Sequence, residues 1–278
     1  MPSGCSMNIM QAELPDRVFD VGIAEGHAVT FSAGMAKAGL KPYCNIYSSF
    51  LQRAYDNIIH DVALPKLPVV LCIDRAGIVG NDGATHHGLF DLAYLRPIPN
   101  MLIGAPMVAS DLRQMMHMAQ GIDSPIAIRY PRGSSIDRDD MPAVELGKAA
   151  CLQQGSDVAV LSIGAIGNTV IAALAAMRPE ERERFAHYDM RWLKPIDREV
   201  LDTVSKQYST IITVEDGVIQ GGLGSAVAEY MGEKGQRRVI RLGVDDQFVE
   251  HGSTKELYQS LKLDKEGICE SLLQALEQ

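Results

Sequence analysis

Short apolar runs rich in β-forming residues alternate along this chain with longer stretches of helical periodicity. This alternation is typical of α/β proteins, in which helices join parallel strands and cover their sheet. The expected strands are residues 43–47, 69–74, 101–105, 126–130, 158–162, 210–215 and 239–242. The expected helices are residues 24–38, 50–63, 109–120, 166–177, 224–233 and 267–275. The sequence therefore predicts an α/β fold with mainly parallel central sheets flanked by helices.

The segment between Arg132 and Val144 is polar and irregular, with a Gly-Ser-Ser triplet and an Asp-Arg-Asp-Asp run. Such a break between two periodic regions is typical of a linker. A length of 278 residues allows two domains of ordinary size. We predict one domain over residues 1–135 and a second over residues 145–278. Because no strand precedes the first expected helix, we expect the first domain to be N-terminally truncated.

The net charge of −9 argues against nucleic acid as a partner, because there is no basic surplus to neutralise phosphates. No apolar run approaches the roughly 20 residues that span a bilayer, so no membrane partner is expected. The five cysteines are scattered and form no CxxC pair. This pattern favours free thiols in a reducing cytoplasm and supports neither a disulfide framework nor a zinc site.

Residues 20–31, DVGIAEGHAVTF, place an acid and an imidazole among small and apolar neighbours. In the expected helix that follows, Glu25 lies where a carboxylate is poorly solvated. A buried carboxylate is paired, protonated or used in chemistry. Glu25 is therefore a candidate catalytic residue. The alternative is a carboxylate at a helix start that backbone N–H groups satisfy.

A second group, YSSFLQR, follows the expected strand 43–47. Open α/β sheets bind ligands beyond the carboxyl ends of their strands, so Tyr47, Phe50 and Arg53 are in a favoured place. The alternative for Phe50 is an ordinary core aromatic side chain.

A third group is the glycine-rich loop DRAGIVGNDGATHHG, residues 74–88, which follows the next expected strand. A long loop with Arg75, Asp82 and two adjacent histidines, His86 and His87, indicates function. A metal site is not predicted, because adjacent histidines point in different directions and no third ligand has zinc-type spacing.

The fourth group, RYPRG, contains Arg129 and Arg132 at the end of a strand. Closely spaced arginines suit a phosphate or carboxylate, and the alternative is an interdomain salt bridge. In the second domain, VEDGVIQGGLGSAV reads as a strand, a turn and a helix start. It lacks the GxGxxG fingerprint, so no dinucleotide is expected, and the turn is predicted to pack its helix tightly against the sheet.

Together, DVGIAEGHAVTF, IYSSFLQRAYDN, DRAGIVGNDGATHHGLFD and RYPRG closely resemble the 1-deoxy-D-xylulose-5-phosphate synthases, thiamine-diphosphate enzymes of the transketolase superfamily. The segment VEDGVIQGGLGSAV resembles the C-terminal domain of that family. The resemblance implies a transferase that condenses pyruvate with glyceraldehyde 3-phosphate, releasing carbon dioxide. Its product, 1-deoxy-D-xylulose 5-phosphate, serves isoprenoid, thiamine and pyridoxal biosynthesis. The family also implies a cytoplasmic homodimer of pyrimidine-binding and C-terminal transketolase domains.

The resemblance also implies roles for single residues. Glu25 matches the carboxylate that binds the aminopyrimidine ring of the cofactor and favours its imino tautomer. Phe50 matches the aromatic residue that stacks on that ring, and Ile23 and Met1 match apolar positions around it. His86 matches a proton donor or stabiliser in catalysis.

The remaining matched positions bind substrate: Tyr47, Arg53, Arg75, Asp82 and Arg132. The family's Gly-Asp-Gly…Asn motif, which holds magnesium and the cofactor diphosphate, is absent from this sequence. We therefore expect a C-terminal fragment without a metal site of its own, inactive in isolation and with a mobile loop at residues 74–88. Two alternatives are a subunit of another transketolase-like enzyme and a non-catalytic dimerisation module.

Overall fold

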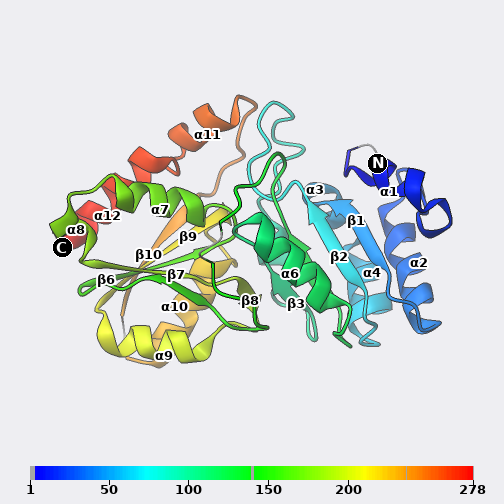
Figure 1. Ribbon diagram of the computed structural model, residues 1–278, viewed down its shortest axis with the longest axis horizontal. Helices are drawn as coiled ribbons and strands as arrows, with labels where there is room; N and C mark the ends of the chain where they lie inside the picture. Colours follow the sequence, from blue (N-terminus) through cyan, green and yellow to red (C-terminus); the bar gives the residue numbers. More distant parts are fainter. Residues whose placement is uncertain (1–3, 139–140, 236, 278) are drawn as a thin grey trace.

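The computed structural model describes residues 4–138, 141–235 and 237–277, and it contains two five-stranded sheets (Figure 1). The first sheet has the order β1-β2-β4-β3-β8, in which the first four strands are parallel and β8 is antiparallel. The second has the order β10-β9-β6-β7-β5, in which only β5 is antiparallel. The predicted α/β class with mainly parallel sheets is confirmed.

The elements before the linker are α1 (Met7–Glu13), α2 (Glu25–Lys37), β1 (Tyr43–Tyr47), α3 (Ser48–Leu51), α4 (Tyr55–Asn57), β2 (Val70–Asp74), α5 (Asp91–Leu95), β3 (Leu102–Gly104), α6 (Ala109–Ala119) and β4 (Ile126–Arg129). Those after it are β5 (Ala150–Gln153), β6 (Val158–Ile163), α7 (Gly167–Ala175), α8 (Pro179–Arg182), β7 (Phe185–Asp189), β8 (Trp192–Lys194), α9 (Arg198–Gln207), β9 (Thr210–Val218), α10 (Leu223–Glu233), β10 (Arg238–Val244), α11 (Thr254–Ser260) and α12 (Lys265–Leu276).

Helices cover both faces of the second sheet, which explains the near-continuous apolar runs of its central strands. Every residue of β6 is buried. Side chains alternate between the faces of a strand, so Val158 and Val160 pack in one cluster with α7 and α12. Ala159 and Leu161 belong to the cluster on the other face, which includes α9 and α10.

Three strands were not predicted, because β5 and β8 are short and β7 carries polar residues. His187 of β7 is buried but paired, since its Nε2 lies 2.8 Å from the Ser162 hydroxyl. Burial lowers the pKa of His187 to about 3, so the imidazole is neutral.

The predicted continuous helix over residues 50–63 is wrong in detail. The segment consists of α3, a 3-10 turn at Gln52–Ala54, the short α4 and a π-helical stretch at Ile58–Ala63. Its helical pitch changes where Ala54 leaves the α region, at φ −108° and ψ 15°. The break follows directly after Arg53, one of the predicted site residues.

The predicted tight turn before α10 is present. Glu215, within β9, accepts the backbone N–H groups of Leu223 and Gly224, each at 2.8 Å. A Cβ on Gly222 would lie 1.9 Å from Glu215 Oε2, so only glycine allows this approach. Burial raises the pKa of Glu215 to about 7.

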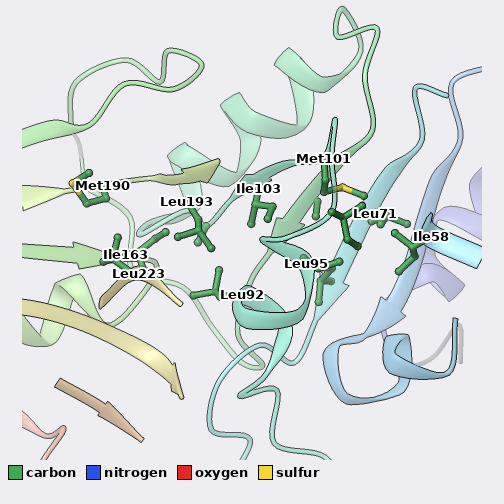
Figure 2. Close-up of a cluster of buried hydrophobic side chains, with 14 of the residues drawn as sticks. Ile58, Leu71, Leu92, Leu95, Met101, Ile103, Ile163, Met190, Leu193 and Leu223 are labelled. Atoms are coloured by element: carbon green, nitrogen blue, oxygen red, sulfur yellow. The ribbon is translucent and has the colours of Figure 1, made fainter. Parts of the chain in front are cut away.

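The two halves of the chain share one core. Strand β8 follows β7 in sequence but pairs with β3 of the first sheet. Figure 2 shows Ile103 and Leu92 of the first half close to Leu193, Ile163 and Leu223 of the second, all in one buried cluster. The domain limits 1–135 and 145–278 stay a prediction.

A buried ion cluster lies where the chain passes between the sheets. Arg191, which follows β7, donates to Asp111 of α6 at 3.2 Å and lies 3.7 Å from Asp189. It also donates to the backbone carbonyls of Pro142 and Ala143 in the linker. The cluster therefore joins β7, the linker and the first domain.

None of the helices in the described part of the chain is both long and apolar enough to cross a bilayer. All five cysteines carry free thiols, as predicted.

We predict that Asp189→Asn weakens the pH dependence of stability. Burial raises the pKa of Asp189 to about 7, although Arg191 opposes the shift. An unfolded chain ionises aspartate near a pKa of about 3.9. The folded protein therefore holds a proton that the unfolded chain has lost between about pH 4 and 7, and stability falls as pH rises through this window. The slope is at most about 1.4 kcal/mol per pH unit.

Urea unfolding of the wild type and the variant at several pH values measures this difference in the free energy of unfolding. The exposed Asp123→Asn is the matched control. If wild type and Asp189→Asn lose stability equally across the window, Asp189 is ionised in the folded protein and the prediction is wrong.

Candidate active site

Three neighbouring strands of the first sheet end at the same edge, and each is followed by candidate residues. Tyr47 is the last residue of β1, Arg75 follows β2, and Arg129 ends β4. Because these strands are parallel and adjacent, their carboxyl ends lie together, where open α/β sheets bind ligands. The sequence motifs found separately therefore converge on one region.

Glu25 is the first residue of α2, and its side chain is only 12% exposed. Arg53 Nη1 donates to Glu25 Oε1 at 2.8 Å. The alternative of a carboxylate satisfied by backbone N–H groups is therefore not what is observed, since the partner is a guanidinium from the turn after α3. Arg53 is 56% exposed, so solvent screens this pair and it contributes little to stability.

Two aromatic rings at the end of β1 and on α3 stack on each other, and an arginine guanidinium lies over each ring. The rings of Tyr47 and Phe50 stack with centroids 5.4 Å apart. The Arg53 guanidinium lies 4.6 Å from the Phe50 centroid, and that of Arg75 lies 4.0 Å from the Tyr47 centroid. Burial raises the pKa of Tyr47, and nearby Arg75 opposes the shift. Phe50 is partly buried against the main cluster, so it is both a core contact and part of the site.

The two adjacent histidines have separate environments. His86 packs edge-on against Phe50 with a centroid distance of 5.1 Å. His87 is 2% exposed and turns toward the second domain, where its Nε2 lies 3.1 Å from the Glu250 carbonyl. Only His86 therefore joins the cluster that contains Glu25 and Phe50.

Two further ion pairs border the cluster. Arg75 Nη1 donates to Asp74 Oδ2 at 2.8 Å, and both side chains are largely buried. Arg132 Nη1 donates to Asp82 Oδ2 at 2.7 Å, and these side chains are 47% and 38% exposed. An exposed pair of this kind is worth about 0–1 kcal/mol, so a bound anion could displace Asp82 from Arg132 at small cost.

Arg129 is not available to bind a ligand and instead follows the alternative for its motif, a contact between the domains. It is 5% exposed, and its Nε donates to Asp91 Oδ2 at 3.0 Å. Its Nη2 donates to the backbone carbonyl of Asp216 in β9 at 2.9 Å. Of the two arginines in RYPRG, Arg129 is therefore an interdomain contact, and Arg132 remains the candidate ligand for a phosphate.

A groove of about 1290 Å³ adjoins the cluster, between β1 and the chain segment before α2. Its lining includes Glu25, Tyr47, Phe50 and Arg53. Ile23 also lines it and is 84% exposed. Met1, the other predicted apolar position, lies outside the described residues. The site residues thus border an open, mostly apolar space.

Local sequence patterns do not reveal several residues that hold the site in place, namely Asp91, Asp216 and Tyr258. Each acts through a contact distant in sequence, so no local spacing marks it. Within the described ranges, no three histidine, cysteine or carboxylate side chains are grouped so as to hold a metal ion.

Comparison with known proteins assigns the family. The transketolase pyrimidine-binding domain matches residues 1–136, and the transketolase C-terminal domain matches residues 147–268. A split-gene transketolase, solved as an inactive β4 tetramer, superposes with a TM-score of 0.85 at 31% identity. That match covers 95% of this chain and 85% of the other. The chain belongs to the transketolase family.

Within this family the chain corresponds to the C-terminal portion of 1-deoxy-D-xylulose-5-phosphate synthases. It is 57% identical over 277 residues to the synthase of Parabacteroides distasonis and 54% identical over 282 residues to that of Bacteroides thetaiotaomicron. These matches cover 98% and 100% of this chain but 44% of each relative. Transketolase from Campylobacter jejuni, at 17% identity and a TM-score of 0.76 over 92% of this chain and 39% of its own, shares the fold.

We predict that Phe50→Leu shifts the NMR signals of the His86 ring protons and leaves those of His87 in place. The Phe50 ring current acts on His86 across the 5.1 Å contact, whereas His87 packs elsewhere. Phe248→Leu is the control, because that exposed ring contacts Phe90 instead. Unchanged His86 signals in Phe50→Leu would contradict the contact between the two rings.

Proposed function

We propose that this chain is the part of a 1-deoxy-D-xylulose-5-phosphate synthase that binds the aminopyrimidine end of thiamine diphosphate and both substrates, pyruvate and glyceraldehyde 3-phosphate. The observation that carries the proposal is the placement of Glu25. Its carboxylate lies at the start of α2, on the wall of the groove and in the same cluster as Phe50. The 57% identity to a synthase supports the same assignment.

The groups present suit the aminopyrimidine ring. Such a ring needs an acceptor for its N–H groups and an apolar or aromatic surface for its face. Glu25 supplies the acceptor once Arg53 is displaced, and Phe50 and Ile23 supply the surface. When bound, thiamine diphosphate supplies the electron sink for decarboxylation of a 2-oxoacid.

The other cluster residues act on the substrates. Arg75 and Arg132 bind the phosphate of the acceptor aldehyde, because guanidinium groups bind phosphate in a bidentate manner. Tyr47 and Asp82 orient the polar groups of the acceptor. His86, beside Phe50, holds the proton that reaches the acceptor oxygen as the new carbon–carbon bond forms.

The magnesium ion and the diphosphate of the cofactor are held, in this proposal, by a region outside this chain. Support comes from the length of the relatives, because the chain spans only 44% of each of the two synthases compared above. We further propose that the complete enzyme is a cytoplasmic homodimer serving isoprenoid, thiamine and pyridoxal biosynthesis.

A second candidate is the subunit of a transketolase-like enzyme whose diphosphate-binding region is a separate chain. The match that covers 85% of a split-gene transketolase chain favours it. Both candidates give Glu25 the same role, and they differ in whether the missing region is fused. A non-catalytic dimerisation module, in contrast, needs no carboxylate at this position.

We predict that Glu25→Gln abolishes synthase activity in a chimera in which this chain replaces the matching segment of the Parabacteroides distasonis enzyme. An amide cannot take up and release a proton at the pyrimidine ring as a carboxyl group can, so kcat falls by about 100-fold or more. Turnover of pyruvate and glyceraldehyde 3-phosphate is the measurement. The control is Glu233→Gln, an exposed carboxylate on α10. Full activity in Glu25→Gln would favour the non-catalytic module.

For the isolated chain we predict weak binding of thiamine diphosphate and no synthase activity. Most of the charge of the cofactor lies in its diphosphate, which has no partner here. Isothermal titration calorimetry with cofactor and magnesium measures the affinity. A micromolar dissociation constant, about −8 kcal/mol, shows that this chain holds the diphosphate and overturns the assignment to an outside region.

A further inference from the structure

The loop between β2 and α5, residues 75–90, carries Asp82 and His86 and is closed at its base. The N–H and carbonyl groups of Gly77 and Gly88 exchange two hydrogen bonds, each of 2.8 Å. Only glycine fits at position 88, since a Cβ there would lie 2.2 Å from the Arg75 carbonyl oxygen. Figure 1 shows this loop, in cyan, beside α11 of the second domain. The residues between these two glycines extend away from the first sheet.

Asp216 of β9 holds the start of this loop. The Ile78 N–H donates to Asp216 Oδ1 at 3.3 Å, and the Tyr258 hydroxyl of α11 donates to Oδ2 at 2.6 Å. A Cβ on Gly77, where φ is +77°, would lie 1.8 Å from Oδ2, so the backbone rests directly on the carboxylate. Asp216 is 6% exposed, so these contacts are protected from water.

His87 holds the end of the loop. Its Nδ1 accepts the N–H of Val79 at 3.1 Å, which leaves the proton on Nε2. That Nε2–H group donates to the Glu250 carbonyl of the second domain at 3.1 Å. His87 thus ties one side of the loop to the other and both to the second domain, one residue after His86.

Apolar packing reinforces both attachments. Ile78 and Leu89, on either side of the loop base, are buried in one cluster with Val218, Val249 and Leu257 of the second domain. The Val218 N–H also donates to the Leu89 carbonyl at 3.0 Å. The base of the loop is therefore packed as part of the second domain, although its sequence belongs to the first.

We propose that His87 and Asp216 are positioning residues, which fix the β2–α5 loop to the second domain and thereby set the places of Asp82 and His86. The role of the loop in binding the acceptor aldehyde rests on the proposed function, whereas its attachment does not. The second domain is then a determinant of acceptor binding without touching the acceptor.

Hydrogen exchange of the 278-residue chain, read by mass spectrometry over residues 78–87, tests the attachment. His87→Asn keeps an acceptor for Val79 at the position of Nδ1 and removes the donor to Glu250. Tyr258→Phe keeps the ring and removes the hydroxyl that holds Asp216. We expect each variant to exchange about fivefold faster in the loop, because one buried hydrogen bond is lost.

Two matched variants separate the attachment from general destabilisation. His87→Gln places an amide donor near the position of Nε2, so it restores slower loop exchange than His87→Asn. Tyr208→Phe removes another buried tyrosine hydroxyl of the second domain, which bonds Gly155 and does not contact the loop. Loop exchange in Tyr208→Phe stays at the wild-type rate. Wild-type rates in both His87→Asn and Tyr258→Phe overturn the proposal.

Kinetics of the chimera test the consequence for the substrate. His87→Asn is expected to raise KM for glyceraldehyde 3-phosphate about fivefold and to change KM for pyruvate less than about twofold. Faster loop exchange with both KM values unchanged contradicts the positioning role. An inactive wild-type chimera contradicts the proposed function instead, and the exchange rates then decide the attachment by themselves.

Discussion

The buried guanidinium of Arg129 is the contact on which the arrangement of the two sheets depends. A charge removed from water is tolerated only when its partners satisfy it, and here Asp91, itself fully buried, is the counter-ion. The other end of the guanidinium donates to the carbonyl of Asp216 and lies 3.4 Å from that of Gly88. Removal of one partner from such a buried pair typically costs about 3–5 kcal/mol. Strand β4, helix α5, the β2–α5 loop and strand β9 therefore hold their places together.

The site built on this frame combines fixed and exchangeable contacts. Buried contacts fix where its elements lie, as the Arg129–Asp91 pair does between β4 and α5. The Glu25–Arg53 pair is half open to solvent and contributes little to stability. A ligand can thus replace Arg53 at small energetic cost while the backbone that carries Glu25 stays in place. This division between a rigid frame and labile partners is what a binding site requires.

Much of the fold could be predicted because hydrophobic burial is local in sequence. A run such as β6, buried throughout and apolar except for Ser162, predicts a central parallel strand covered on both faces. Strand β7 was not predicted because His187 and Asp189 are polar. Their burial is explained only by their partners outside the strand. The break in the helix after β1 was not predicted either, because the backbone conformation of Ala54 has no signature in the residue pattern.

The motifs that form the site could be predicted from the sequence. Which of their residues face the site and which are buried in structural contacts could not. Arg129 and Arg132 have equal chemistry and lie three residues apart, yet one is buried between the domains and the other faces Asp82. His86 and His87 are likewise neighbours with opposite surroundings. Such choices depend on which direction a side chain takes from the strand end or loop. A contact such as that of Asp216 with Ile78, 138 positions apart, carries no local sequence pattern at all.

The most direct test of the account is a crystal structure of the chimera with thiamine diphosphate and magnesium bound. We expect the aminopyrimidine ring to lie between Glu25 and Phe50, and the diphosphate and magnesium to contact the region contributed by the Parabacteroides distasonis enzyme. A cofactor whose ring lies away from Glu25, or whose diphosphate is held by residues of this chain, would contradict it.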